Sequence, residues 1–333
     1  MTETSEKGKY LIETRNLKKY FPAGRGSWLH AVDDVSIRVA RGETLGVVGE
    51  SGCGKTTLGR TILRLHQPTS GQIFLDGEEI AGMKASKLRS IRTKMQIVFQ
   101  DPYSSLNPRM TVEASIAEPM VVNHMYKTTS EVYTRVDELM EIVGLAPRLA
   151  SSFPHEISGG MRQRVGIARA LAVNPEFIVC DEPVSALDVS IQAQVLNLMM
   201  DLQEEFKLAY LFVTHDLSVV RHISHHIAVM YLGQCVEMAP SRSIFKAPRH
   251  PYTKALLDAV PVPKLSARRH RMPTIRGEVV SPVDPKPGCR FAPRCPYVSD
   301  QCAEAQQLRE LEPDHFVACC RANEIATQLS VKA

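Results

Sequence analysis

The stretch Gly49-Glu50-Ser51-Gly52-Cys53-Gly54-Lys55-Thr56 follows an apolar run, Glu43–Val48, and leads into a helical pattern. Its glycine spacing, ending in a lysine and a hydroxyl residue between a strand and a helix, matches a phosphate-binding loop. The glycines let backbone N–H groups crowd phosphates, Lys55 adds a positive charge, and the Thr56 hydroxyl suits Mg²⁺. Cys53 is interpreted as a small residue without special chemistry. The stretch therefore predicts an α/β domain with a phosphate-binding site.

Short apolar strands and helical patterns alternate along the next part of the chain. Strands are expected at Met95–Phe99, Phe177–Cys180 and Leu208–Val213. Apolar residues recur at helical spacing between Ile191 and Phe206, and residues from about 111 to 149 are expected to be mainly helical. Repeated strand, loop and helix units imply a largely parallel sheet, in which ligands bind at the carboxyl ends of the strands.

Polar side chains follow the predicted strands at that edge of the sheet. Asp181 can hold Mg²⁺ and Glu182 can polarise a water for in-line attack on a γ-phosphate, although exposed turn carboxylates are the alternative. His215 is placed to contact the γ-phosphate, but lone histidines are usually structural. Gln100 is placed to reach Mg²⁺ or the attacking water, or is an unremarkable residue at a strand end. These side chains are the candidates for catalysis.

A second phosphate-gripping element lies at Ile157-Ser158-Gly159-Gly160-Met161. A Ser-Gly-Gly turn that opens a helix presents a hydroxyl and free backbone N–H groups. The chain already has a complete phosphate loop. A second such element makes sense if it serves the nucleotide of another chain.

The order of these motifs resembles that of the ATP-binding cassette (ABC) ATPases over roughly Tyr10 to Phe245. The resemblance implies a P-loop NTPase cassette with a RecA-like core, an antiparallel β subdomain and a helical subdomain at about 101–170. Gln100 then matches the Q-loop, Asp181 the Walker B aspartate and Glu182 the catalytic glutamate. His215 matches the switch histidine.

The resemblance also implies how the residues divide between two ATP sites of a cassette dimer. The chain's own site would bind ATP through Phe21, Tyr20, Gly49, Glu50, Ser51, Gly52, Cys53, Gly54, Lys55, Thr56, Thr57 and Asp181. Thr56, Gln100 and Asp181 would hold Mg²⁺. The partner's site would be completed by Ser158, Gly159, Gly160, Met161 and Asp188, the last from a D-loop at Ser185–Asp188.

Two of these assignments have an alternative or depart from the usual motif of the family. Phe21, with Tyr20 as second choice, is expected to stack on adenine, although a basic residue could make a cation–π contact there instead. Met161 stands where the signature turn usually ends in glutamine, and methionine lacks the amide's hydrogen bonds. The serine and glycines carry the phosphate contacts, so the turn is expected to function.

Three further stretches are similar to ATPases of oligopeptide and dipeptide importers: Gln100–Pro108, Phe153–Glu156 and Arg249–Leu256. The similarity implies an ATP-hydrolysing importer subunit, most often for peptides, with nickel, sugars or antibiotics as other solutes. Its groove beside the Q-loop would receive a helix of the permease through Tyr103, Ser104, Ser105, Leu106 and Asn107. A plain surface loop is the alternative for these residues.

The C-terminal part has a different composition. Prolines crowd the chain after about Phe245, which excludes long helices and central strands. We expect a cassette at 8–245 and a small irregular extension at 246–333. A basic run, Arg268-Arg269-His270-Arg271, is read as a solvated loop or a contact with acidic lipid headgroups.

Five of the eight cysteines lie in this extension, at Cys289, Cys295, Cys302, Cys319 and Cys320. In a reducing compartment such clustering favours a metal over disulfides, and the loose spacing fits an iron–sulfur cluster better than zinc. Arg290 and Arg294 could offset thiolate charge. Zinc and unligated thiols remain alternatives. Resemblance to the extensions of some peptide-importer ATPases implies a [4Fe-4S] cluster on Cys289, Cys295, Cys302 and Cys319, with Cys320 spare.

Composition limits the partners and the location. The net charge of +4 is too small to indicate nucleic-acid binding. No apolar run reaches the ~18 residues of a membrane span, and the polar start Met1–Lys7 lacks a secretory signal. We therefore expect a protein at the cytoplasmic face of the cell membrane, held there by two permease subunits.

The resemblance implies further partners and leaves two other functions open. A second ABC ATPase subunit is expected, a different chain being favoured over an identical one, with an external solute-binding protein as an indirect partner. The alternatives are a DNA-repair ATPase and a translation-associated cassette protein. Those classes usually carry long coiled coils, inserted zinc modules or two cassettes in one chain, and none of these is seen here.

Overall fold

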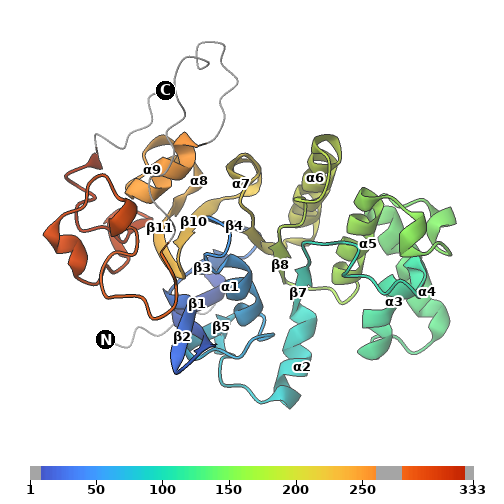
Figure 1. The fold of residues 1–333 in the computed structure, drawn as a ribbon. Coiled ribbons are helices and arrows are strands. Elements are labelled where there is room, and N and C mark those ends of the chain that lie inside the picture. The colour runs from blue at the N-terminus through green and yellow to red at the C-terminus, as the bar shows by residue number, and fades with distance from the viewer. Residues whose placement is uncertain (1–8, 260–279, 327–333) are drawn as a thin grey trace, which may run out of the picture. The chain divides into compact units, whose positions relative to one another are not determined.

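The computed structural model describes residues 9–259 and 280–326 (Figure 1). The basic run Arg268–Arg271 lies outside these ranges. The described residues divide into two compact units. The first comprises the chain up to Leu11, Val39–Glu43 and Gly82–Phe212, and the second comprises Ile12–Arg38, Thr44–Ala81 and the chain from Val213 onward. The division cuts across the sequence, so each unit is assembled from distant segments.

The first unit combines three strands of a sheet with a group of helices. The strands run in the order β9-β8-β7, and β7 pairs with β8 in parallel. The elements are α2 (Ala85–Lys94), β7 (Met95–Val98), α3 (Val112–Val122), α4 (Thr129–Ile142), α5 (Gly159–Leu171), β8 (Phe177–Asp181), α6 (Val189–Phe206) and β9 (Ala209–Val213). α3, α4 and α5 lie within the predicted helical subdomain.

The helices of this unit begin where the sequence supplies caps. Thr128 and Glu131 form a reciprocal capping box at the start of α4. Ser158 caps α5, and Asp188 caps α6 by accepting a hydrogen bond from the Ile191 N–H. The strands β8 and β9 are buried along their whole length, as expected for strands covered on both faces.

The second unit contains an antiparallel sheet and part of a second sheet. The antiparallel strands follow the order β2-β1-β5-β6, which confirms the expected antiparallel β subdomain. The other sheet runs β12-β13-β11-β10-β4 in this unit. The elements of the second unit are β1 (Tyr10–Gly24), β2 (Ser27–Val35), β4 (Thr44–Val48), α1 (Lys55–Ile62), β5 (Ser70–Leu75), β6 (Glu78–Glu79), α7 (Leu217–Ile223), β10 (His226–Tyr231), β11 (Gln234–Pro240), α8 (Ser241–Lys246), α9 (Pro251–Asp258), β12 (Arg309–Glu312) and β13 (His315–Val317). The short strand β3 (Arg38–Ala40) has only Arg38 in this unit.

The C-terminal strands, which were not among the strands predicted from the sequence, extend the sheet mainly in the antiparallel direction. β10 pairs with β4 in parallel, but β10–β11, β11–β13 and β13–β12 are antiparallel. Leu232 and Gly233, both with positive φ, form the two-residue turn that reverses β10 into β11. Such a turn can only join antiparallel strands.

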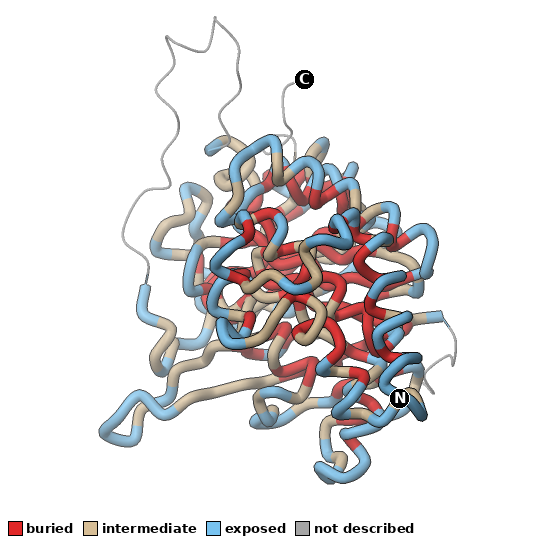
Figure 2. Tube along the Cα trace, turned by 90° about the vertical axis from the view of Figure 1, so that its right-hand side faces the viewer, coloured by how far each residue is buried: buried red, intermediate tan, exposed pale blue. Residues whose placement is uncertain are grey.

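The extension therefore adds two short strands at an edge of the sheet, which agrees with the absence of long elements expected from its prolines. A buried ion pair supports this arrangement, because His315 of β13 contacts the fully buried Glu237 of β11 at 2.7 Å. Burial follows the strands, while the tip of the β1–β2 hairpin is exposed (Figure 2). No helix among the described residues is long and apolar enough to cross a membrane.

Candidate nucleotide-binding and catalytic site

The phosphate loop lies between β4 and α1 in the second unit. The Lys55 ammonium is buried and donates to the carbonyl oxygens of Gly49 at 2.7 Å and Glu50 at 3.0 Å. The loop thus curls around its own lysine, leaving a positively charged cradle that fits a nucleotide phosphate. Cys53 is buried, and burial raises the pKa of its thiol, which agrees with its interpretation as a small packing residue.

Two glycines of this loop have no room for a side chain. A Cβ on Gly49 would lie 2.2 Å from the Met230 carbonyl oxygen, and one on Gly54 would lie 1.9 Å from the Ala31 carbonyl oxygen. Both glycines also have positive φ. The loop is therefore pressed against β2 and the end of β10, and the glycines are needed for this close approach.

His215 lies next to the phosphate loop in the second unit. The Thr214 N–H donates to the Val47 carbonyl oxygen at 3.2 Å, which places the residue before His215 beside the end of β4. His215 is exposed at this edge, and Asp216 caps α7 by accepting from the Ser218 N–H at 2.7 Å. The contact between His215 and a bound phosphate stays a prediction.

Tyr20 and Phe21 are neighbours on β1 with different surroundings. Tyr20 stacks on His30 at 3.9 Å between ring centroids, and its hydroxyl donates to Asp33. Burial and this carboxylate raise the pKa of Tyr20. Phe21 lies beneath the Lys19 ammonium, which is 4.6 Å from the ring centroid. Since Tyr20 is already engaged, Phe21 is the better candidate for stacking on a base.

Gln100 and Glu182 meet in the first unit. The Gln100 side-chain amide donates to the Glu182 carboxylate at 2.9 Å. The parallel register of β7 and β8, in which Val98 pairs with Cys180, brings these residues side by side just beyond the strands. Glu182 has a φ of 47°, so it sits in a left-handed turn immediately after the buried Asp181. A carboxylate and an amide therefore converge at this edge, as catalysis of water attack requires.

The signature turn and the D-loop pack against each other in the same unit. A Cβ on Gly160 would lie 2.5 Å from the Ile191 side chain, and one on Gly159 would lie 3.4 Å from Leu187. Ser158 accepts from the Met161 N–H at 3.4 Å, and Met161 is exposed. The start of α5 thus packs closely against the D-loop and the first turn of α6.

Comparisons with known proteins decide the family. The family described as "ABC transporter" matches residues 32–185, and "Oligopeptide/dipeptide transporter, C-terminal region" matches residues 236–302. The oligopeptide transport ATP-binding protein AppF of Bacillus subtilis is 52% identical over 326 residues, which cover 95% of this chain and 98% of AppF. This chain belongs to the ABC transporter family. OppF of the same organism, also an oligopeptide transport ATP-binding protein, is 50% identical over 94% of this chain and 97% of its own length.

Solved structures agree with this assignment to the ABC family. The ATP-binding cassette MJ0796 bound to ADP and Pi, a dimer, has a TM-score of 0.64 and 30% identity, covering 69% of this chain and 99% of MJ0796. The cbiO1 protein of Clostridium perfringens, part of an ABC transporter complex, has the same TM-score with 26% identity, covering 71% of this chain and 91% of cbiO1. The protein is accordingly an ABC ATPase with the cassette fold, for which ATP and Mg²⁺ are expected.

The loop after Gln100 is anchored to α5 of this ABC ATPase. Arg169 donates to the Ser105 carbonyl oxygen at 2.6 Å, and the Arg162 guanidinium covers the Tyr103 ring at 5.1 Å. Tyr103 is 54% exposed. The prediction that Leu106 lines a docking groove is wrong, because Leu106 is only 3% exposed and serves as an apolar anchor of the loop.

The remaining candidates in that loop are at the surface. Ser104 and Asn107 are exposed, and Ser105 is half-buried. Neither Arg162 nor Arg169 was singled out by its sequence pattern. Arg162 lies in the first turn of α5 and Arg169 in its last turn, so both belong to the helix that begins at the signature turn, and they link this helix to the loop.

The C-terminal extension of this ABC ATPase contains a cluster of cysteines. The positions of these cysteines do not by themselves form a metal site. The Cys289 N–H donates to the Cys302 carbonyl oxygen at 2.8 Å, and the Cys302 and Cys320 sulfurs are 3.8 Å apart. Burial raises the pKa values of the Cys289, Cys295 and Cys319 thiols to about 11. Within the described ranges, no group of three or more His, Cys, Asp or Glu residues is arranged to hold a metal ion.

The expectation that Arg290 and Arg294 offset thiolate charge is wrong. Arg290 pairs with Asp33, and Arg294 pairs with Glu50 of the phosphate loop. Both arginines are thus paired with carboxylates of the same unit, the buried Asp33 and the partly exposed Glu50. Sequence patterns carried no signal for these contacts, since 257 and 244 residues separate the partners.

Proposed function

We propose that this chain is the ATP-hydrolysing subunit of a membrane importer for dipeptides or oligopeptides. The observation that supports this function best is the presence in one chain of the ABC cassette and a C-terminal region described as that of oligopeptide/dipeptide transporters. AppF and OppF, which share this architecture over nearly their whole length, are oligopeptide transport ATP-binding proteins.

In this proposal the chain works with a second cassette, and a different ATPase chain is favoured. Its own phosphate loop binds one ATP through Lys55 and the loop's backbone N–H groups, with Phe21 against the base. Thr56, Gln100 and Asp181 hold Mg²⁺, which supplies charge neutralisation when bound. Ser158, Gly159, Gly160, Met161 and Asp188 face the nucleotide of the partner.

The chain's own residues then carry out ATP hydrolysis and couple it to the permease. Glu182 orients and deprotonates the attacking water, Gln100 holds the Glu182 carboxylate in place, and His215 contacts the γ-phosphate. Tyr103, Ser104, Ser105 and Asn107 form the exposed part of a loop anchored on α5, and this surface receives the permease. Two permease subunits hold the chain at the cytoplasmic face of the membrane, and an external solute-binding protein delivers the peptide.

The function is tested by reconstitution of this chain with the permease pair of an oligopeptide importer and a second ATPase subunit. We expect the three components to co-purify and ATP hydrolysis to rise about tenfold when a peptide-loaded binding protein is added. A matched preparation with Tyr103→Ala should keep basal hydrolysis and lose this stimulation. Stimulation by DNA or ribosomes, without any response to permease, would contradict the importer function.

We further propose a [4Fe-4S] cluster in the extension, on Cys289, Cys295, Cys302 and Cys319. The chemistry of the donors supports this proposal, because cysteine thiolates are the ligands of such clusters and a backbone hydrogen bond joins Cys289 to Cys302. The cluster would tie down a segment that has too little apolar surface to fold by burial alone. Zinc is the alternative metal.

Metal analysis of anaerobically purified protein tests the cluster. A brown preparation with roughly four iron and four sulfide per chain is expected. Cys319→Ser should abolish this content, whereas Cys320→Ser should retain it. Retention in Cys319→Ser and loss in Cys320→Ser would instead make Cys320 the fourth ligand. A colourless preparation with one zinc per chain would refute the cluster.

A further inference from the structure

Two buried arginines of the extension reach the nucleotide-binding elements of the second unit. They lie in the arginine segment, Cys289–Cys295, and their side chains are only 7% (Arg290) and 6% (Arg294) exposed. Arginines are seldom buried this far without a strict geometric partner. We propose that Arg290 and Arg294 are positioning residues that set the ATP affinity of this chain's own site.

Arg294 contacts the phosphate loop directly. Its two terminal nitrogens donate to the two oxygens of the Glu50 carboxylate at 2.9 and 3.0 Å, a bidentate pair. The Arg294 guanidinium also donates to the Tyr231 hydroxyl at 3.2 Å. The Glu50 N–H donates to the Tyr252 hydroxyl at 2.9 Å, so Glu50 is gripped through both its side chain and its backbone.

The contacts that hold Glu50 in place also affect Lys55 of the phosphate loop. The Lys55 ammonium donates to the Glu50 carbonyl oxygen at 3.0 Å, so the position of Glu50 helps to fix the position of this ammonium group. Moving Glu50 would redirect the ammonium that meets the nucleotide phosphates. Arg294 thus acts on ATP through Glu50 without touching it.

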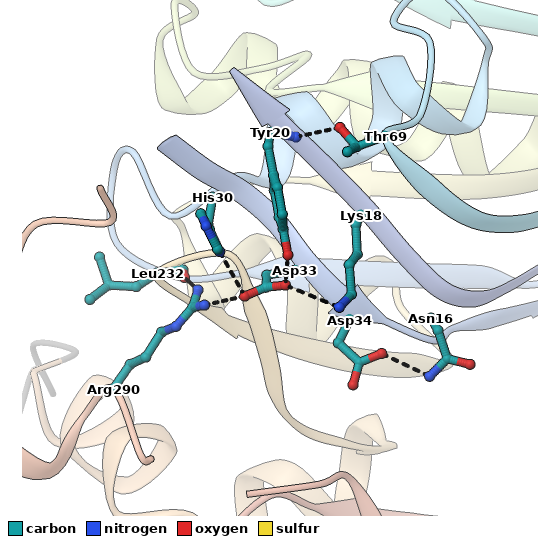
Figure 3. A network of polar contacts seen from close by, with 9 residues as sticks. All are labelled: Asn16, Lys18, Tyr20, His30, Asp33, Asp34, Thr69, Leu232 and Arg290. Carbon is teal, nitrogen blue, oxygen red and sulfur yellow. Dashed lines mark hydrogen bonds and ion pairs between the residues drawn. The ribbon is translucent and has the colours of Figure 1, made fainter. Parts of the chain in front are cut away.

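Arg290 supports the other side of the same site (Figure 3). It donates to the Asp33 carboxylate and to the Leu232 carbonyl oxygen. Asp33 in turn accepts from the Tyr20 hydroxyl and contacts His30 Nδ1 at 3.1 Å. Arg290 therefore fixes the pairing of β1 and β2, on which Phe21 is the residue next to Tyr20.

The Leu232 contact leads back to the phosphate loop. The Gly233 N–H donates to the Cys53 carbonyl oxygen at 2.8 Å, and the Asp33 N–H donates to the Gly233 carbonyl oxygen at 2.8 Å. Arg290 holds this short chain of contacts at Asp33, which is one of its ends, and at Leu232, which precedes Gly233. The two arginines thus support the phosphate loop from Glu50 on one side and from Cys53 on the other.

An aromatic core makes the arginine segment a rigid support. Phe291, between the two arginines, is 1% exposed and contacts Tyr231 and Tyr252 with ring centroids 5.3 and 5.4 Å apart. A second contact holds the start of the extension, because Asp284 accepts from the Trp28 N–H of β2 at 3.0 Å. The extension is in this way built into the nucleotide-binding unit.

The proposal rests on ATP binding at this chain's own phosphate loop, so the test includes a reporter of that site. Binding of a fluorescent ATP analogue to the full-length chain is measured by equilibrium titration, with steady-state kinetics beside it. Arg294→Gln should raise the dissociation constant about tenfold, and Arg290→Gln several-fold, with KM raised and kcat changed less than about twofold. Lys286→Gln, which removes a charge from an exposed position nearby, is the matched control and should match wild type.

A double-mutant cycle isolates the contact. Glu50→Gln should weaken binding to the same extent as Arg294→Gln, and the double variant should be no weaker than either one. Arg294→Lys should be intermediate, since lysine keeps the charge but loses the bidentate geometry. If Arg294→Gln fails to fold by circular dichroism, Glu50→Gln removes the same contact from the other side.

The outcomes separate the two proposals. If Lys55→Ala abolishes binding while Arg294→Gln, Glu50→Gln and Arg290→Gln all bind like Lys286→Gln, the arginines are not positioning residues. Additive effects of Arg294→Gln and Glu50→Gln would also overturn the proposal. If Lys55→Ala leaves binding unchanged, the ATP site itself has been placed wrongly.

Discussion

The Glu182→Gln variant is expected to hydrolyse ATP at least about 100-fold more slowly than wild type while still binding it. The carboxylate is the proposed base at the end of β8, and glutamine keeps its shape and its contact with Gln100 but cannot take a proton. In the proposed cassette pair, closure needs ATP and reopening needs hydrolysis, so the variant should accumulate as an ATP-bound dimer. Single-turnover phosphate release and size-exclusion chromatography with ATP measure the two effects.

The exposed carboxylate Glu204 on α6 provides the matched control. Glu204→Gln removes the same charge from the same unit and should hydrolyse ATP at the wild-type rate. Hydrolysis by Glu182→Gln at the wild-type rate would show that another group is the base.

Replacing Gly54 by alanine is expected to weaken ATP binding by about 100-fold or more, because two penalties combine at this position. Gly54 has a φ of 105°, which alanine adopts only with strain. The new Cβ would also lie 1.9 Å from the Ala31 carbonyl oxygen, and backbone cannot yield as a flexible side chain can. The start of α1 must therefore shift, carrying the neighbouring Lys55 away from the phosphates.

Titration with a fluorescent ATP analogue measures this loss, and thermal denaturation shows whether the fold survives. Gly82→Ala is the control, because Gly82 lies outside the loop and a Cβ there meets nothing within 4 Å. Wild-type affinity in a folded Gly54→Ala protein would mean that the loop tolerates the displacement.

Residues at the end of a local element were predictable because their placement depends on their neighbours in the chain. The strand before Gly49, the turn at Ser158 and the carboxylates after β8 all lie where apolar patterns end. Even the meeting of Gln100 with Glu182 follows once two strands are taken as adjacent and parallel. The sequence pattern could not supply the register of β7 against β8, which the packing of their side chains decides.

Other features depended on which surfaces pack together. Leu106 sits in a polar loop beside Tyr103, so its burial could not be read from the neighbouring residues. The antiparallel direction of β11 depends on a tight turn at Leu232 and Gly233, which lacks the Asn-Gly or Asp-Gly signal of such turns. For this reason the antiparallel strands at this end of the sheet were not predicted.

The sequence by itself determined the cassette family, the phosphate loop and the carboxylates at the strand end, because short-range backbone requirements specify each of them. Only the tertiary structure decided that Arg294 grips Glu50 and that Arg290 grips Asp33. Closing the chain over more than 200 residues costs conformational entropy, and burial of the aromatic core around Phe291 offsets that cost. No local pattern encodes such a balance, so the contacts that join the extension to the ATP site became visible only in the folded chain.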